Sequence, residues 1–147
     1  MTPGRLALAA LLALAATPVI ARDDRPALPL DAALAKGQQY HDKIDPQIKL
    51  YFGSQPTPPV AKTIGQWTSN KKTNAFGKSD QEACEIAFIS AVISLQQRAK
   101  LEGGNAVINI VSVYKNSRFE SPTEYQCGAG ALMAGVALRG TVVTLGQ

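Results

Sequence analysis

The hydrophobic pattern changes several times after residue 46, and each change predicts an element. Residues 47–52 alternate apolar and polar positions, which is typical of a strand. Three prolines in residues 53–59 predict a loop, and an extended pattern resumes over residues 60–68. The polar residues 69–78, which include three lysines, predict a second loop. This half of the pattern therefore predicts two strands, each followed by a loop.

A helix is predicted over residues 80–101, where the apolar positions recur at helical spacing. The apolar stripe consists of Cys84, Phe88, Ala91 and Leu95. Its start carries a capping box, because Ser79 can accept a hydrogen bond from the backbone N–H of Glu82, and Glu82 can reach back to that of Ser79. Two glycines at 103–104 supply the stop.

The remaining chain predicts more strands. Residues 105–114 are rich in β-branched side chains, and residues 115–123 form a polar connection. A short strand is predicted about residues 125–127, followed by a Gly/Ala-rich bend and a final strand over residues 136–145. The order β-β-α-β-β predicts one α+β domain, residues 46–147. We expect an antiparallel sheet of about four strands with one principal helix, about 80–101, packed on one face.

The first 21 residues have the features of a signal peptide. Arg5 precedes an unbroken Leu/Ala run over residues 6–16, and small or aliphatic residues precede a cleavage site after Ala21. A membrane anchor is the competing interpretation, but the run is shorter than the roughly 20 apolar residues of a spanning helix. No cysteine follows the site to carry a lipid. We therefore expect a periplasmic or secreted protein without a membrane span.

The segment after the expected cleavage site, residues 22–45, mixes charged residues with two prolines and shows little core pattern. Residues 30–40 are compatible with a short helix, but the segment as a whole predicts a flexible arm.

The net charge and the histidine content limit the classes of ligand that the protein is expected to bind. The formal charge is +4, and it falls to +3 when Arg5 is removed with the signal peptide. This charge is too small to predict a nucleic-acid partner. His41 is the only histidine, so no metal site with recognisable ligand spacing can be assembled. We expect no metal and no cofactor.

Cys84 and Cys127 are the only cysteines. An oxidising compartment favours a disulfide between them. Two buried free thiols are an alternative, as is a metal site that recruits carboxylates.

Gly77-Lys78-Ser79 matches the end of a phosphate-binding P-loop. That motif needs a glycine at position 72, and this position holds Lys72. The tripeptide is explained by the helix start, so we expect no ATP binding. Lys71, Lys72 and Lys78 are possible contacts for an anion, and a solvated loop is the plainer interpretation.

The sequence predicts no catalytic residues. Two S-x-x-K matches begin at Ser69 and Ser112, but one lies in a predicted loop and the other in a predicted strand. That chemistry requires the serine at a helix N-terminus in a buried cleft. We therefore expect a protein that is not an enzyme.

Two stretches resemble a small α+β superfamily: E-G-G-N-A-V-I-N-I, residues 102–110, and V-A-L-R-G-T-V-V-T-L, residues 136–145. One branch is the family of heavy-metal-binding pentameric domains, and another is the Rcs envelope-stress sensor lipoprotein. The chain also resembles small exported bacterial proteins of uncharacterised function that are sometimes labelled excision-nuclease ATPase subunits. The resemblance implies the β-α-β-β half of the fold and supports a Cys84–Cys127 bridge. It assigns no functional residue.

These observations predict an exported, non-enzymatic domain that binds a partner in the cell envelope, either a protein or an anionic component. The alternative is a metal- or anion-binding module that uses the basic loop 69–78.

Overall fold

The structure is a computed structural model that describes residues 15–17, 22–39 and 44–146. The expected cleavage site after Ala21, most of the expected signal peptide, and His41 lie outside these residues. The elements are β1 (Ala27–Pro29), α1 (Leu30–Gly37), β2 (Lys49–Phe52), β3 (Val60–Asn74), α2 (Asp80–Leu101), β4 (Ala106–Ser112), the 3₁₀ turn η1 (Tyr114–Asn116), β5 (Glu124–Gln126), β6 (Gly128–Ala129) and β7 (Met133–Leu145).

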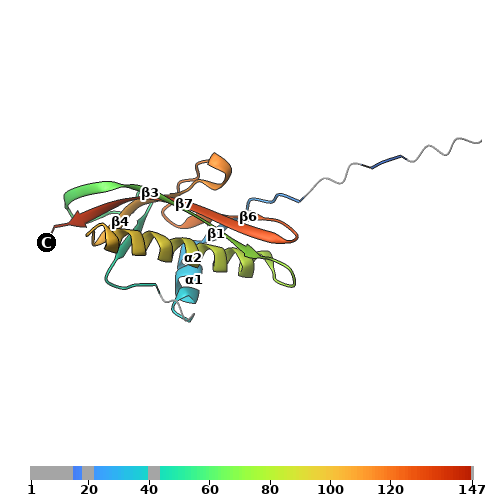
Figure 1. Ribbon diagram of the computed structural model, residues 1–147, viewed down its shortest axis with the longest axis horizontal. Coiled ribbons are helices and arrows are strands. Elements are labelled where there is room, and N and C mark those ends of the chain that lie inside the picture. Colours follow the sequence, from blue (N-terminus) through green and yellow to red (C-terminus); the bar gives the residue numbers. More distant parts are fainter. Residues whose placement is uncertain (1–14, 18–21, 40–43, 147) are drawn as a thin grey trace, which may run out of the picture.

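The fold is α+β, with a curled five-stranded sheet in the order β2-β4-β7-β3 and with β6 paired to β7 (Figure 1). The expectation of a purely antiparallel sheet is wrong, because β2 and β4 are parallel. Residues 53–59 carry the chain from β2 at one edge to β3 at the other, so these two consecutive strands are not neighbours. β5 also leaves the main sheet and pairs with β1 in a separate two-stranded sheet.

β3 and β7 are longer than the pattern predicts. β3 continues through residues 69–74, which we expected to be a loop, and β7 begins at Met133 rather than near residue 136. The two strands pair from Asn74 opposite Met133 to Val60 opposite Leu145. This pairing satisfies the backbone of a polar segment, and the edge position leaves the side chains of Asn70, Lys71, Lys72 and Asn74 exposed to water. Pairing with β7 therefore overrides the weak strand propensity of residues 69–74.

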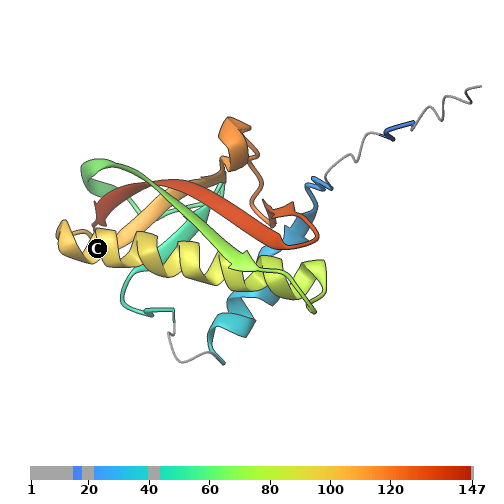
Figure 2. The same ribbon diagram turned by 45° about the vertical axis from the view of Figure 1, so that its right-hand side comes forward.

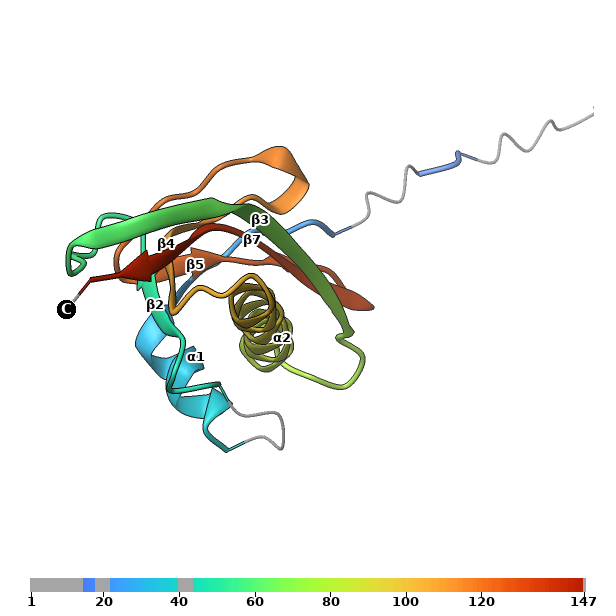
Figure 3. The same ribbon diagram turned by 60° about the vertical axis from the view of Figure 1, so that its left-hand side comes forward.

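Helix α2 has the predicted bounds, and it crosses the concave face of the sheet (Figures 2 and 3). Its Phe88 ring lies 5.9 Å from the Phe52 ring and is stacked on Tyr125 at 4.2 Å between centroids. The opposite side of α2 is also covered, since the Gln96 side-chain amide donates to the carbonyls of Asp45 and Ile48. Burial on two sides explains why apolar residues cover most of the helix surface. Within the described parts of the chain, no helix combines the length and apolar character needed to cross a bilayer.

The segment expected to be a flexible arm contributes to the core. α1 packs against α2 (Figure 3). Leu30 and Ala33 are buried in the same hydrophobic cluster as Phe88. The backbone N–H of Leu30 donates to the carbonyl of Thr123 at 2.9 Å. α1 is only eight residues long and most of its apolar positions are alanine, which is why the sequence pattern of a buried helix is weak here.

Ser79 caps α2 as predicted: its hydroxyl accepts from the backbone N–H of Glu82 at 3.1 Å. Among the described residues, Glu82 makes no bond back to Ser79, so half of the capping box forms. We predict that Ser79→Ala lowers the free energy of unfolding by about 1 kcal/mol, because one N–H loses its acceptor. Lys78→Ala is the control; it removes an exposed contact to the Asn74 carbonyl and should cost less than about 0.5 kcal/mol. Urea unfolding measures both, and equal losses would contradict the cap.

Candidate anion-binding site

The convex face of the sheet, away from α2, carries a group of polar and basic side chains. β7 is central in the sheet, and its Arg139 pairs with Thr68 of β3 and Val111 of β4. Ala137 pairs with Asn70 on the same face. Paired residues share a face and successive residues alternate between faces. The register therefore aligns these positions on the side opposite α2.

The connection between β4 and β5 folds back over this convex face (Figure 3). The backbone N–H of Val113 donates to the carbonyl of Ala137 at 2.8 Å, and Ser112 forms a bridge with Phe119. Lys115 and Asn116 then take positive φ angles, 48° and 61°. Two successive residues in this region turn the chain sharply, at a conformational cost that glycine would not have. The turn places Lys115 and Asn116 beside a pocket on this face, which is described below.

Tyr114 fixes the position of this connection. Its ring lies against Gly128 and Gly135, where a β-carbon on Gly128 would overlap the ring. The guanidinium of Arg25 and the ammonium of Lys115 lie 5.6 and 5.5 Å from the ring centroid. Both distances allow cation–π attraction. Gly128 and Gly135, in neighbouring strands, thus leave room for the Tyr114 ring, which holds the turn in place.

A pocket of about 340 Å³ lies between the turn and the strands. Its lining consists of Thr68, Asn70, Val113, Lys115, Asn116, Arg118, Ala137 and Arg139. Three of these residues are cationic, three are polar and uncharged, and none is acidic. Such a lining presents N–H and O–H donors and positive charge, which is the chemistry that binds a carboxylate or a phosphate group.

Two of the three cations already have acidic neighbours at the rim. Lys115 Nζ lies 3.2 Å from Asp23 Oδ2, and Arg118 lies 2.8 Å from a carboxylate oxygen of Glu120. The hydrogen bond from Lys115 holds the pKa of the Asp23 carboxyl below its usual range. Among the described residues, no carboxylate lies within ion-pair distance of Arg139. Arg139 is therefore the cation best placed to receive an anion from solution.

The three lysines singled out from the sequence do not line this pocket. Lys71 and Lys72 are successive residues of β3, so their side chains leave opposite faces of the strand. Lys78 lies in the turn before α2, where its Nζ donates to the carbonyl of Asn74 at 3.2 Å. Residues 69–74 are strand rather than loop, so a single basic loop 69–78 does not exist. Anion contacts by these lysines stay predictions.

The pocket residues could not be predicted from the sequence because they come from segments that are distant in the chain. Lys115, Arg118 and Arg139 are brought together only by the β4–β7 pairing and the folded connection. One signal was present: Arg139 is the only charged residue in the apolar run 136–145. A lone arginine in the middle of a central strand needs a polar environment, and the pocket provides it.

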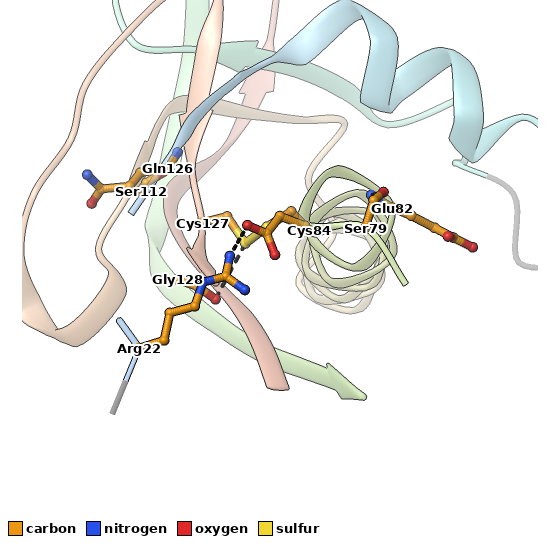
Figure 4. Close-up of a disulfide and its surroundings, with 9 residues drawn as sticks. Arg22, Ser79, Glu82, Cys84, Ser112, Gln126, Cys127 and Gly128 are labelled. Carbon is orange, nitrogen blue, oxygen red and sulfur yellow. Dashed lines mark hydrogen bonds and ion pairs between the residues drawn. A yellow bond between two sulfur atoms is a disulfide. The ribbon is translucent and has the colours of Figure 1, made fainter. Parts of the chain in front are cut away.

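Cys84 and Cys127 form a disulfide, with their Cα atoms 5.9 Å apart (Figure 4). Both side chains are fully buried, and the bond joins the second turn of α2 to the residue between β5 and β6. The pairing predicted from the oxidising compartment is confirmed, and the alternative of two free thiols is wrong. Within the described residues, no group of three or more His, Cys, Asp or Glu side chains is placed to hold a metal ion.

The serines of the two S-x-x-K matches are buried in strands. Ser112 Oγ accepts from the backbone N–H of Gln126 at 2.9 Å, which is a structural contact between two segments. Ser69 is also buried, on the face of β3 toward α2.

Burial raises the pKa of the Tyr125 phenol far above its usual range, and the charge of Glu85 adds to this effect. The phenol is therefore a neutral core group at physiological pH.

Comparison of the chain with protein-family models, with curated proteins and with solved structures finds no match. The resemblance to the pentameric-domain and envelope-sensor families therefore stays a prediction.

Proposed function

We propose that this protein is an exported, non-enzymatic binding domain whose convex-face pocket holds an anionic group of a partner in the cell envelope. The observation that carries the proposal is the pocket lining: Lys115, Arg118 and Arg139 converge without a lining carboxylate. The apolar walls formed by Val113 and Ala137 lower the local dielectric and so strengthen the attraction of an anion. An enclosed disulfide supports an oxidising destination such as the periplasm.

Arg139 is the centre of the proposed site. A guanidinium donates two parallel hydrogen bonds to the paired oxygens of a carboxylate or phosphate. Asn70 and Asn116 supply amide donors beside it, and Thr68 supplies a hydroxyl. The pocket thus suits a group with two or three exposed oxygens rather than a spherical halide. The proposal requires no catalytic base, since its function is recognition.

Titration with inorganic phosphate and with citrate, at about 0.15 M salt to screen weak surface attraction, tests the site by NMR. We predict that Arg139→Gln weakens binding of the preferred anion about tenfold or more, because a charge-assisted hydrogen bond is lost. Arg98→Gln is the matched control: it makes the same charge change on α2, outside the pocket. Equal weakening by both variants, or no saturable binding of either anion, would refute the proposal. Stronger binding of phosphate or of citrate distinguishes the two classes of partner.

A further inference from the structure

Two loops meet at one end of the molecule and expose apolar side chains there. The loop after β3 and the loop before β7 lie side by side (Figure 2), and the backbone N–H of Ala75 donates to the carbonyl of Leu132 at 2.8 Å. Phe76 is 75% exposed, Leu132 is 66% exposed and Met133 is 49% exposed. We call these three residues the apolar tip. Phe76 is distant in sequence from Leu132 and Met133, so the pairing of β3 with β7 brings the three residues to the same end of the molecule.

Three of the five exposed large apolar residues of the described chain lie together at the apolar tip. Only two other large apolar residues among the described ones are exposed, Val60 and Leu101, and they lie elsewhere in the chain. Isolated exposed apolar residues are common on soluble proteins, but a contiguous cluster indicates an interaction site.

Basic residues surround the apolar tip. Lys71 and Lys72 lie near the end of β3, three and two residues before Asn74, and Lys78 lies two residues after Phe76. The first acidic residue of α2, Asp80, is in an ion pair with Arg22, which offsets its charge. The only other acidic residue in the first turn of α2 is Glu82. The exposed end of the two loops is therefore apolar, and the residues next to it carry a net positive charge.

We propose that the apolar tip inserts into the surface of an anionic lipid bilayer and that Lys72 and Lys78 contact the headgroups. Interfacial insertion needs a few exposed apolar side chains with cations at headgroup level, and this arrangement is present. A protein partner fits less well. Three such side chains can bury on the order of 400 Å², whereas each partner in a standard protein interface buries roughly 800 Å².

The disulfide links the two segments from which the loops of the tip extend. Cys84 is five residues after the Ser79 cap, and Cys127 directly precedes β6, which leads into the loop that carries Leu132. The bond therefore joins the first turns of α2 to the segment that leads into β6 (Figure 4). A fixed arrangement of the three side chains lowers the entropy lost when they enter a bilayer.

The test is sedimentation of the exported protein with vesicles of phosphatidylcholine that contain about 30% phosphatidylglycerol, a fraction chosen to give a clear negative surface. We expect Leu132→Ser, and independently Phe76→Ser, to lower the partition coefficient about tenfold, because one apolar side chain is lost from the interface. Leu101→Ser is the matched control, since Leu101 is equally exposed but lies at the other end of α2. It should change binding less than about twofold.

The charged rim is tested in the same assay. Lys72→Gln should weaken binding about fivefold, whereas Lys62→Gln, at an exposed position near the far end of β3, should have little effect. Failure of the tip and failure of the pocket are distinguishable, because vesicle binding is tested with Leu132 and Phe76 and anion titration is tested with Arg139. Absence of binding to anionic vesicles would overturn the proposal. So would equal losses for Leu132→Ser and Leu101→Ser, or crosslinking of the tip to a protein without retention on vesicles.

Discussion

Reduction of the Cys84–Cys127 disulfide is expected to lower the free energy of unfolding by about 4 kcal/mol. The bond closes a loop with a sequence separation of 43 residues, and its loss gives the unfolded chain the freedom that the loop removes. The loss is a large share of the ~5–15 kcal/mol that stabilises a domain of this size. Urea unfolding with and without reductant measures the difference. Because both sulfur atoms are buried, reductant reaches them only when this region opens, so the samples need long equilibration.

Cysteine variants provide the control for this prediction. Cys84→Ala and Cys127→Ala should each destabilise the protein about as much as the double variant, because either change removes the whole bond. Alanine is preferable to serine here, since a hydroxyl at these fully buried positions would lack a partner. Additive losses, or reduced protein as stable as oxidised protein, would contradict the prediction.

Truncation of Leu30 is expected to cost about 3 kcal/mol. Leu30 begins α1, is 3% exposed and belongs to the main hydrophobic cluster, so Leu30→Ala leaves a cavity in that cluster. The measurement is the urea midpoint at unchanged slope. This result would show that α1 is part of the folded domain.

The control for Leu30 is Leu101→Ala, which removes the same atoms from a side chain that is 76% exposed. It should cost less than about 0.5 kcal/mol. Similar small effects for both variants would restore the interpretation of residues 22–45 as a flexible arm. A loss confined to Leu30→Ala would exclude it.

The sequence predicted α2 accurately because several local signals agree there. An apolar period, a serine cap and two terminal glycines all indicate residues 80–101. β3 shows the opposite case, since residues 69–74 are polar and become strand only through pairing with β7. The parallel pairing of β2 with β4 also depends on a partner more than fifty residues away, which no local pattern specifies.

The candidate pocket could not be predicted from the sequence, because it too depends on contacts between distant segments. Its cations come from the turn after β4 and from the centre of β7, and its remaining donors come largely from β3. Each segment is unremarkable alone, and the lysines that stood out in the sequence lie elsewhere. Disulfide pairing, by contrast, required only two cysteines and an expected compartment, so it could be predicted.

The position of β7 in the sheet has a consequence for the order of events when the chain is made. β7 hydrogen-bonds to β3, β4 and β6, and all three precede it in the sequence. A chain that emerges from a ribosome or a translocation channel presents its N-terminal residues first. Until residues 133–145 emerge, β3 and β4 lack the strand that joins them, and the face that α2 covers is incomplete. The main sheet can therefore be completed only after the last strand, β7, has emerged.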